Sequence, residues 1–124
     1  MTAEWRRLCR GSHFEFEGDD VIVRFENGRS HRVQLHETDD AFELHCVVAR
    51  SIAGRSHRDL SLWIWRVNRA AQLVSFRIDA RGRVVASGWM PKAGVTAQEF
   101  QMVLRRVAVE SDRLEFLLTG KDRE

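Results

Sequence analysis

The sequence predicts an α+β fold in the order βββ–α–ββ–α, in which helices pack against a five-stranded antiparallel sheet. Apolar and polar residues alternate through most of the first half, whereas two later stretches repeat their apolar residues at helical spacing. The chain has 124 residues, 44% hydrophobic and 31% charged, which is the size and composition of one globular domain. We therefore expect residues 1–124 to form a single domain.

The first half is expected to form a three-stranded antiparallel meander with one buried face. The apolar residues that recur at every second position are Phe14, Phe16, Val21, Val23, Phe25, Val33, Leu35, Phe42, Leu44, Cys46 and Val48. Residues 18–20 are a turn or a bulge in the first strand region. Asn27-Gly28 predicts a hairpin, because both residues tolerate positive φ. A short helix at residues 2–9 is compatible with the pattern.

The period then changes to that of a helix over residues 59–71, with Asp59 or a serine just before it as the candidate cap. Alternation returns at residues 74–79 and again at residues 84–90, with a turn at Arg81-Gly82 between them. These two segments predict a second hairpin.

A long helix is expected to close the chain. Thr96 and Glu99 form a capping box, in which each side chain satisfies the free backbone amide of the other residue. The stripe that follows is apolar and consists of Phe100, Val103, Leu104, Val107, Leu114 and Leu118. This stripe is expected to pack on the sheet.

The middle helix has two apolar faces. The residues expected to pack on the sheet are Leu60, Trp63, Ile64, Val67 and Ala71. Leu62 and Trp65 fall nearly opposite, beside Arg69, and leaving each of these apolar side chains in water forgoes roughly 1.5–3 kcal/mol. Since tryptophan and arginine are frequent at interface hot spots, we expect a homodimer or partner interface at Leu62, Trp65, Arg66 and Arg69. The alternative is that the last helix or the N-terminal segment covers this face within one molecule.

The net charge of +2 conceals an asymmetry. Residues 12–49 hold three arginines and nine carboxylates, a balance of −6, whereas residues 50–92 hold eight arginines and one lysine against two carboxylates, a balance of +7. One interpretation is a site for nucleic acid or another polyanion in the arginine-rich 50–92 region, at Arg55, Arg58, Arg66 and Arg69. The favoured one is that the two halves face each other, within a molecule or across a dimer, because the basic residues are scattered.

No catalytic, cofactor or metal-binding motif is found. The five histidines show no HxH or HxxxH spacing, and the cysteines no CxxC. His45 and Cys46 are neighbours on a strand and point to opposite faces, so they cannot act as a pair. Cys9 and Cys46 are expected to be reduced thiols. We thus expect no enzyme, no cofactor and no small-molecule substrate.

No apolar run approaches the roughly 20 residues that cross a bilayer. No signal peptide is visible at the N-terminus. We therefore expect a cytoplasmic protein without membrane contact.

Four segments of the chain resemble a known family. Residues 65–69 (Trp-Arg-Val-Asn-Arg), residues 73–79 (Leu-Val-Ser-Phe-Arg-Ile-Asp), Gly82 with Val84, and the Pro91 segment before the last helix are similar to the centre of YbjN-like domains. These domains in turn resemble the class I chaperones of type III secretion. The resemblance implies an α/β sandwich-like fold, frequent homodimerisation and protein binding without catalysis.

The expected function is a non-enzymatic protein-binding module, either chaperone-like or a regulator of sensory transduction. Its partners would be a second copy of itself and an unidentified protein. The alternative, from a different class, is the electrostatic binding of nucleic acid or another polyanion.

Overall fold

The computed structural model describes residues 2–11, 13–49, 57–70 and 73–119. It confirms the predicted α+β class. The elements are η1 (Thr2–Cys9), β1 (Phe14–Glu17), β2 (Asp20–Arg24), β3 (Ser30–Glu37), β4 (Ala41–Ala49), α1 (His57–Ala70), β5 (Ser75–Ile78), β6 (Val84–Pro91) and α2 (Ala97–Thr119). The short N-terminal segment that the sequence suggested is a 3-10 helix.

The strands form one antiparallel sheet in the order β1-β2-β3-β4-β6-β5. It has six strands rather than the expected five, because residues 18–20 turn the chain and do not form a bulge. Gly18 has φ of +62°, which is accessible to glycine at little cost, and Phe14 then pairs with Val23. The segment predicted as the first strand is therefore a hairpin of two strands, β1 and β2.

The turn at Asn27-Gly28 forms as predicted. Gly28 has φ of +88°, and the backbone N–H of Phe25 donates to the carbonyl of Arg29 at 2.8 Å. The Asn27 side chain accepts a hydrogen bond from the backbone N–H of Arg29 at 3.0 Å. Of the two central residues, the glycine alone takes positive φ.

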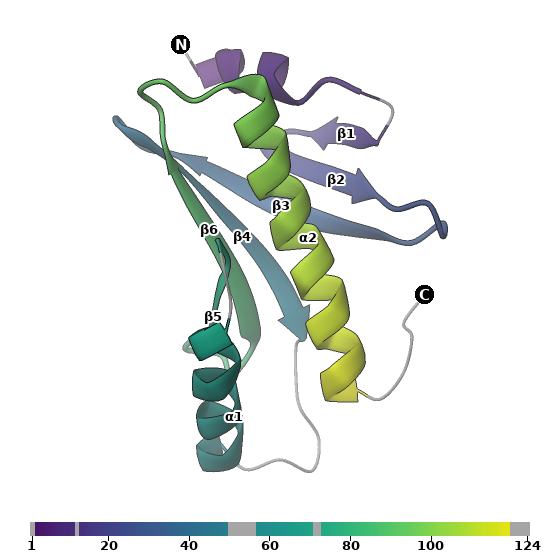
Figure 1. Cartoon of the computed structure of the whole chain (residues 1–124), viewed down its shortest axis with the longest axis vertical. Helices are drawn as coiled ribbons and strands as arrows, with labels where there is room; N and C mark the ends of the chain where they lie inside the picture. Colours follow the sequence, from purple (N-terminus) through teal and green to yellow (C-terminus); the bar gives the residue numbers. More distant parts are fainter. Residues whose placement is uncertain (1, 12, 50–56, 71–72, 120–124) are drawn as a thin grey trace.

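Helix α2 crosses one face of the sheet diagonally (Figure 1). The capping box is present: the Thr96 N–H donates to Glu99 Oε1 at 3.0 Å and the Glu99 N–H to Thr96 Oγ1 at 3.1 Å. All six residues of the predicted apolar stripe are buried. Gly88 on β6 lets the helix approach closely, because a Cβ at this position would lie 2.8 Å from Val107 Cγ2.

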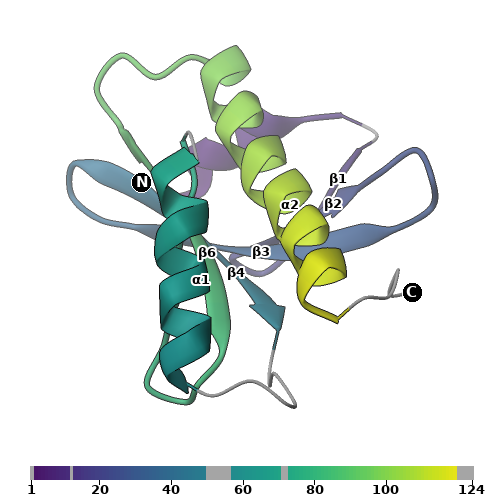
Figure 2. The same ribbon diagram turned by 60° about the horizontal axis from the view of Figure 1, so that its bottom comes forward.

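Helix α1 lies beside α2 on the same side of the sheet, next to the edge strand β5 (Figure 2). Leu60 and Ile64 are buried in the common core, and Trp63 and Val67 are partly buried against it, as the helical wheel predicts. Ala71 lies outside the described residues. The helix begins at His57, so Asp59 is not its N-cap, and the serine just before it, Ser56, also lies outside them.

The other face of the sheet is uncovered by any helix of the described part of the chain. Side chains alternate along each strand, and paired residues share a face. The residues on this open face include Glu43, His45, Val47, Ser75, Arg77, Val85, Ser87 and Trp89. Among the described helices, none is long and apolar enough to cross a membrane.

Candidate protein-binding surface

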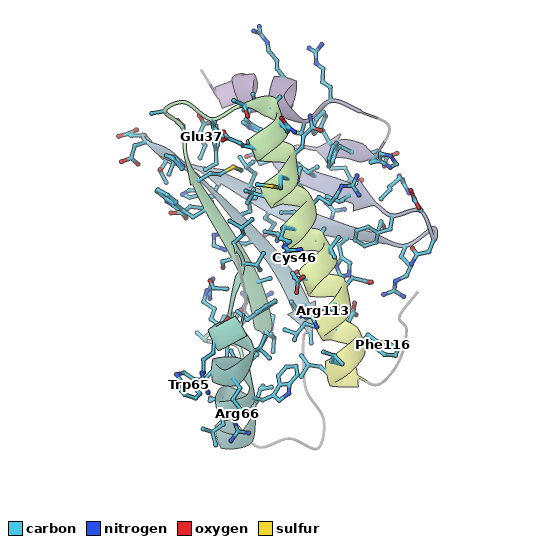
Figure 3. All side chains as sticks on the ribbon, viewed as in Figure 1. Glu37, Cys46, Trp65, Arg66, Arg113 and Phe116 are labelled. Atoms are coloured by element: carbon cyan, nitrogen blue, oxygen red, sulfur yellow. The ribbon has the colours of Figure 1, made fainter. Side chains whose placement is uncertain are left out.

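The outward face of α1 carries the four residues that the sequence proposes as an interface. Leu62 is 45% exposed and Trp65 is 59% exposed, and Arg66 and Arg69 are exposed as well. Trp65 projects from the side of α1 turned away from α2 (Figure 3). Within the described part of the chain neither α2 nor the N-terminal segment covers this face, which the sequence had left as an alternative.

Two of the four residues contact each other. The guanidinium carbon of Arg69 lies 5.1 Å from the centre of the Trp65 ring, a cation–π arrangement between residues four apart on the helix. This contact restricts both side chains before any partner arrives, so less side-chain entropy is lost on binding. We call Leu62, Trp65, Arg66 and Arg69 the α1 outer face.

The structure describes only part of the proposed polyanion site. Arg66 and Arg69 lie on the α1 outer face, whereas Arg55 and the side chain of Arg58 lie outside the described residues. Arg69 is engaged with Trp65. Arg66 and Arg69 thus share their surface with the apolar side chains of Leu62 and Trp65.

The two oppositely charged halves meet at one described ion pair. Lys92 from the basic half contacts Glu37 from the acidic half at 2.7 Å. Two of the three arginines of the acidic half pair within it: Arg24 with Glu15 at 2.7 Å and Arg32 with Glu17 at 2.6 Å. Much of the acidic charge is therefore neutralised locally.

A second polar cluster lies between β3 and α2, where the sequence indicated nothing. His31 Nε2 lies 3.2 Å from Asp112 Oδ1 and 3.5 Å from Glu115 Oε1. These three side chains are mostly buried and are spaced closely enough to hold a metal ion. However, Asp112 Oδ1 also accepts hydrogen bonds from Nε and Nη2 of Arg29. We therefore interpret the cluster as a charge network that fixes α2 to the β2–β3 hairpin.

Cys46 belongs to the edge of this network. Its Sγ lies 3.7 Å from His31 Nδ1, so cysteine, histidine and aspartate follow one another as in a nucleophilic triad. Burial raises the pKa of the Cys46 thiol to about 11, and the residue is only 2% exposed. A buried, protonated thiol is a poor nucleophile, so the arrangement is structural.

Strand parity separated His45 from Cys46 correctly. His45 faces the open side of the sheet and its Nδ1 lies 3.2 Å from Ser87 Oγ, whereas Cys46 faces α2. The contact between Cys46 and His31 was not predicted from the sequence, because it joins residues that are 15 positions apart on neighbouring strands. Asp112 is 81 positions from His31. The signal available in sequence was that His31 shares the strand face of Val33 and Leu35.

The architecture has close counterparts among solved structures. A chain of the heterodimeric ExoU–SpcU complex from the type III secretion system of Pseudomonas aeruginosa aligns with TM-score 0.65 and 15% identity, over 98% of this chain and 100% of that one. A chain of the ExsC–ExsE complex gives 0.59 and 16%, over 93% and 87%. YbjN from E. coli, a candidate transcription regulator, gives 0.60 and 13%, over 86% and 80%.

The chain has the YbjN-like, type III secretion chaperone-like fold. The resemblance that the sequence suggested is thus confirmed for the fold. At these low identities the likeness establishes the fold alone. No family model and no curated protein sequence matches the chain.

Proposed function

We propose that this chain is a non-catalytic, chaperone-like or regulatory module that forms a homodimer through the α1 outer face and holds a segment of a protein partner. The observation that carries the proposal is the exposure of Leu62 and Trp65 on a helix whose other side is buried in the core. Two apolar side chains in one turn, with arginines beside them, have the composition of an interface hot spot.

The fold supports the protein-binding part of the proposal. Two of the similar structures were determined as protein complexes, ExoU–SpcU and ExsC–ExsE. The charge network and the buried cysteines of this chain serve packing, which leaves exposed surface as the means of action. The similarity to YbjN keeps the regulatory version of the proposal open beside the chaperone version.

Sedimentation velocity at micromolar concentration tests the dimer. The wild-type chain should sediment with twice its mass of 14.4 kDa, and a Leu62→Glu, Trp65→Glu variant should sediment as a monomer. Met102→Glu is the matched control, because Met102 is similarly exposed, at 52%, but lies on α2. If the double variant keeps the wild-type mass while its circular dichroism is unchanged, the proposed interface is wrong.

Co-purification tests the partner. A tagged chain co-expressed with the products of its neighbouring genes should retain one of them after a high-salt wash, since an apolar interface resists salt. A polyanion binder would instead release its ligand steeply with salt. Retention that disappears at high salt would contradict the protein-binding proposal.

A further inference from the structure

A cavity of about 500 Å³ opens on the uncovered face of the sheet, where β4 and β6 meet the start of β5. This volume falls in the range of ordinary ligand pockets. The residues that line it include Glu43, His45, Leu73, Ser75, Ser87 and Trp89. The cavity is separate from the α1 outer face.

Its apolar walls are Trp89 and Leu73, which are 61% and 54% exposed. Leu73 has φ of +67°, a left-handed conformation that is unfavourable for a residue with a side chain. This conformation is normally supplied by glycine, which has no side chain to clash. The leucine places an exposed apolar side chain in the wall instead, and strain of this kind is typical of binding sites.

The cavity also has a negative end. Glu43 is the cross-strand partner of Trp89, and its side chain is 39% exposed. His45 Nε2 lies 3.7 Å from the Glu43 carboxylate, while its other ring nitrogen is held by Ser87. Arg77 lies on the same face on β5, two residues beyond Ser75, whereas Glu43 lies on β4. The negative charge of the cavity is therefore on its β4 side. A carboxylate next to an exposed indole ring suits a guanidinium or ammonium group.

A partner segment can approach the cavity across the face of the sheet, but it cannot extend the sheet at the edge of β5 beside Phe76. The backbone N–H of Phe76 donates to Asn68 Oδ1 at 2.8 Å, and Asn68 Nδ2 donates to the Phe76 carbonyl at 2.7 Å. These bonds occupy the outward-facing groups of β5 at that residue, so an added strand cannot pair there. A partner segment therefore reaches this region through a side chain.

We propose that this cavity binds an arginine or lysine side chain of the partner segment, with the cation between Trp89 and the Glu43 carboxylate and the aliphatic stem against Leu73. This inference rests on the proposed function, namely that the chain holds a protein segment. It adds the chemistry of the residue that is recognised and the side chains that recognise it.

Titration with short peptides, followed by ¹H–¹⁵N NMR of the tryptophan indole groups, tests the proposal. The probes are acetyl-Ala-Arg-Ala-amide and the same peptide with citrulline, which is neutral and nearly isosteric with arginine. The Trp89 indole signal should shift saturably with the arginine peptide, and binding of the citrulline peptide should be about tenfold weaker. Glu43→Gln should reduce the affinity for the arginine peptide to that for the citrulline peptide. Leu73→Gly should reduce the affinity for both peptides.

Phe116→Ala is the matched control, because it removes a 48% exposed aromatic side chain on α2, outside both the cavity and the α1 outer face, and it should leave both affinities unchanged. Equal binding of the two peptides, or no shift of the Trp89 signal at 10 mM peptide, overturns the proposal. A Trp89 signal that shifts with protein concentration and not with peptide overturns it too, since a second copy would then cover the cavity.

The same samples separate this proposal from the proposed function. If the wild-type chain sediments as a dimer and retains the co-purified partner, but the arginine peptide fails to bind to it, the cavity assignment alone is wrong. If dimer and partner are lost from the wild-type chain as well, the proposed function fails with it.

Discussion

Asn68 on α1 makes both free backbone hydrogen bonds of Phe76 on the edge strand β5, as a neighbouring strand would, at 2.7 and 2.8 Å. One side-chain amide thus closes a sheet edge and fixes the end of α1 at the same time. This geometry gives a physical reason for an asparagine near the end of the helix. It also sets the position of the α1 outer face relative to the sheet.

Replacing Asn68 by alanine should lower the free energy of unfolding by about 1–3 kcal/mol, because a partly buried donor and acceptor lose their partners. Urea unfolding measures the change. Asn27→Ala is the control, since it removes one hydrogen bond in an exposed turn and should cost about 0.5–1 kcal/mol. Equal losses in the two variants would contradict the role given to Asn68.

Gly88→Ala should destabilise the chain by about 1–3 kcal/mol through overpacking. The new Cβ would lie 2.8 Å from Val107 Cγ2 and 3.3 Å from Val103 Cγ1, so α2 or its side chains must move. Urea unfolding of the single variants and of the Gly88→Ala, Val107→Ala double variant forms the test. The double variant should be more stable than the sum of the two single losses predicts, and simple additivity would argue against this contact.

Asp79 should make the stability of the β5–β6 hairpin depend on acid pH. The backbone N–H of Arg83, the Arg83 guanidinium and the backbone N–H of Arg81 donate to its carboxylate. These bonds lower its pKa below the ordinary value of 3.8. A carboxyl whose pKa is depressed by folding stabilises the fold above that value, and the contribution is lost as pH falls through the folded-state pKa.

The melting temperature of Asp79→Asn should therefore lie below that of the wild-type chain at pH 7, and the difference should shrink toward pH 2. The same substitution at the exposed Asp39 controls for the change in net charge. A difference for Asp79→Asn that stays constant with pH would rule out the titration of this carboxylate as its cause.

The two cysteines should be inert in the folded chain and should weaken it at alkaline pH. Burial is the main cause that raises the pKa of Cys9 and of Cys46 to about 11. A group whose pKa is raised by folding contributes stability below its unfolded pKa, about 9, which is lost as pH rises toward 11. The urea midpoint should thus fall over this range, and less in a Cys9→Ala, Cys46→Ala variant.

Thiol labelling checks the same account at pH 8. A disulfide reagent such as dithiobis-nitrobenzoate should react with neither thiol in the native chain and with both in urea. Rapid native reaction of Cys46 would show that the network at His31 activates it after all.

Features that depend on neighbouring residues could be predicted from the sequence. The Thr96–Glu99 capping box and the two faces of α1 follow from spacing alone, and strand alternation placed His45 and Cys46 on opposite faces. The turn at residues 18–20 remained ambiguous, since a glycine next to two aspartates is compatible with a bulge and with a tight turn. The φ angle of Gly18 decided between them.

Features that depend on packing between distant elements could not be predicted. The need for a glycine at position 88 arises from the path of α2 across β6, and the His31–Asp112 contact from the register of β3 beneath the same helix. Leu73 gave no sequence signal, because positive φ is expected at glycine or asparagine. The sequence predicted the α1 outer face only as apolar residues on the side of the helix opposite the core. This pattern does not identify the partner that covers the face.

The most direct test of the central proposal is an isotope-filtered NOE experiment on a 1:1 mixture of ¹³C-labelled and unlabelled chains. The account predicts intermolecular NOEs from the Leu62 methyl groups and the Trp65 ring, with none from Met102. Intermolecular NOEs confined to the exposed residues of α2, such as Met102 and Phe116, would contradict it. So would a sample that sediments as a dimer but shows no intermolecular NOE from Leu62 or Trp65.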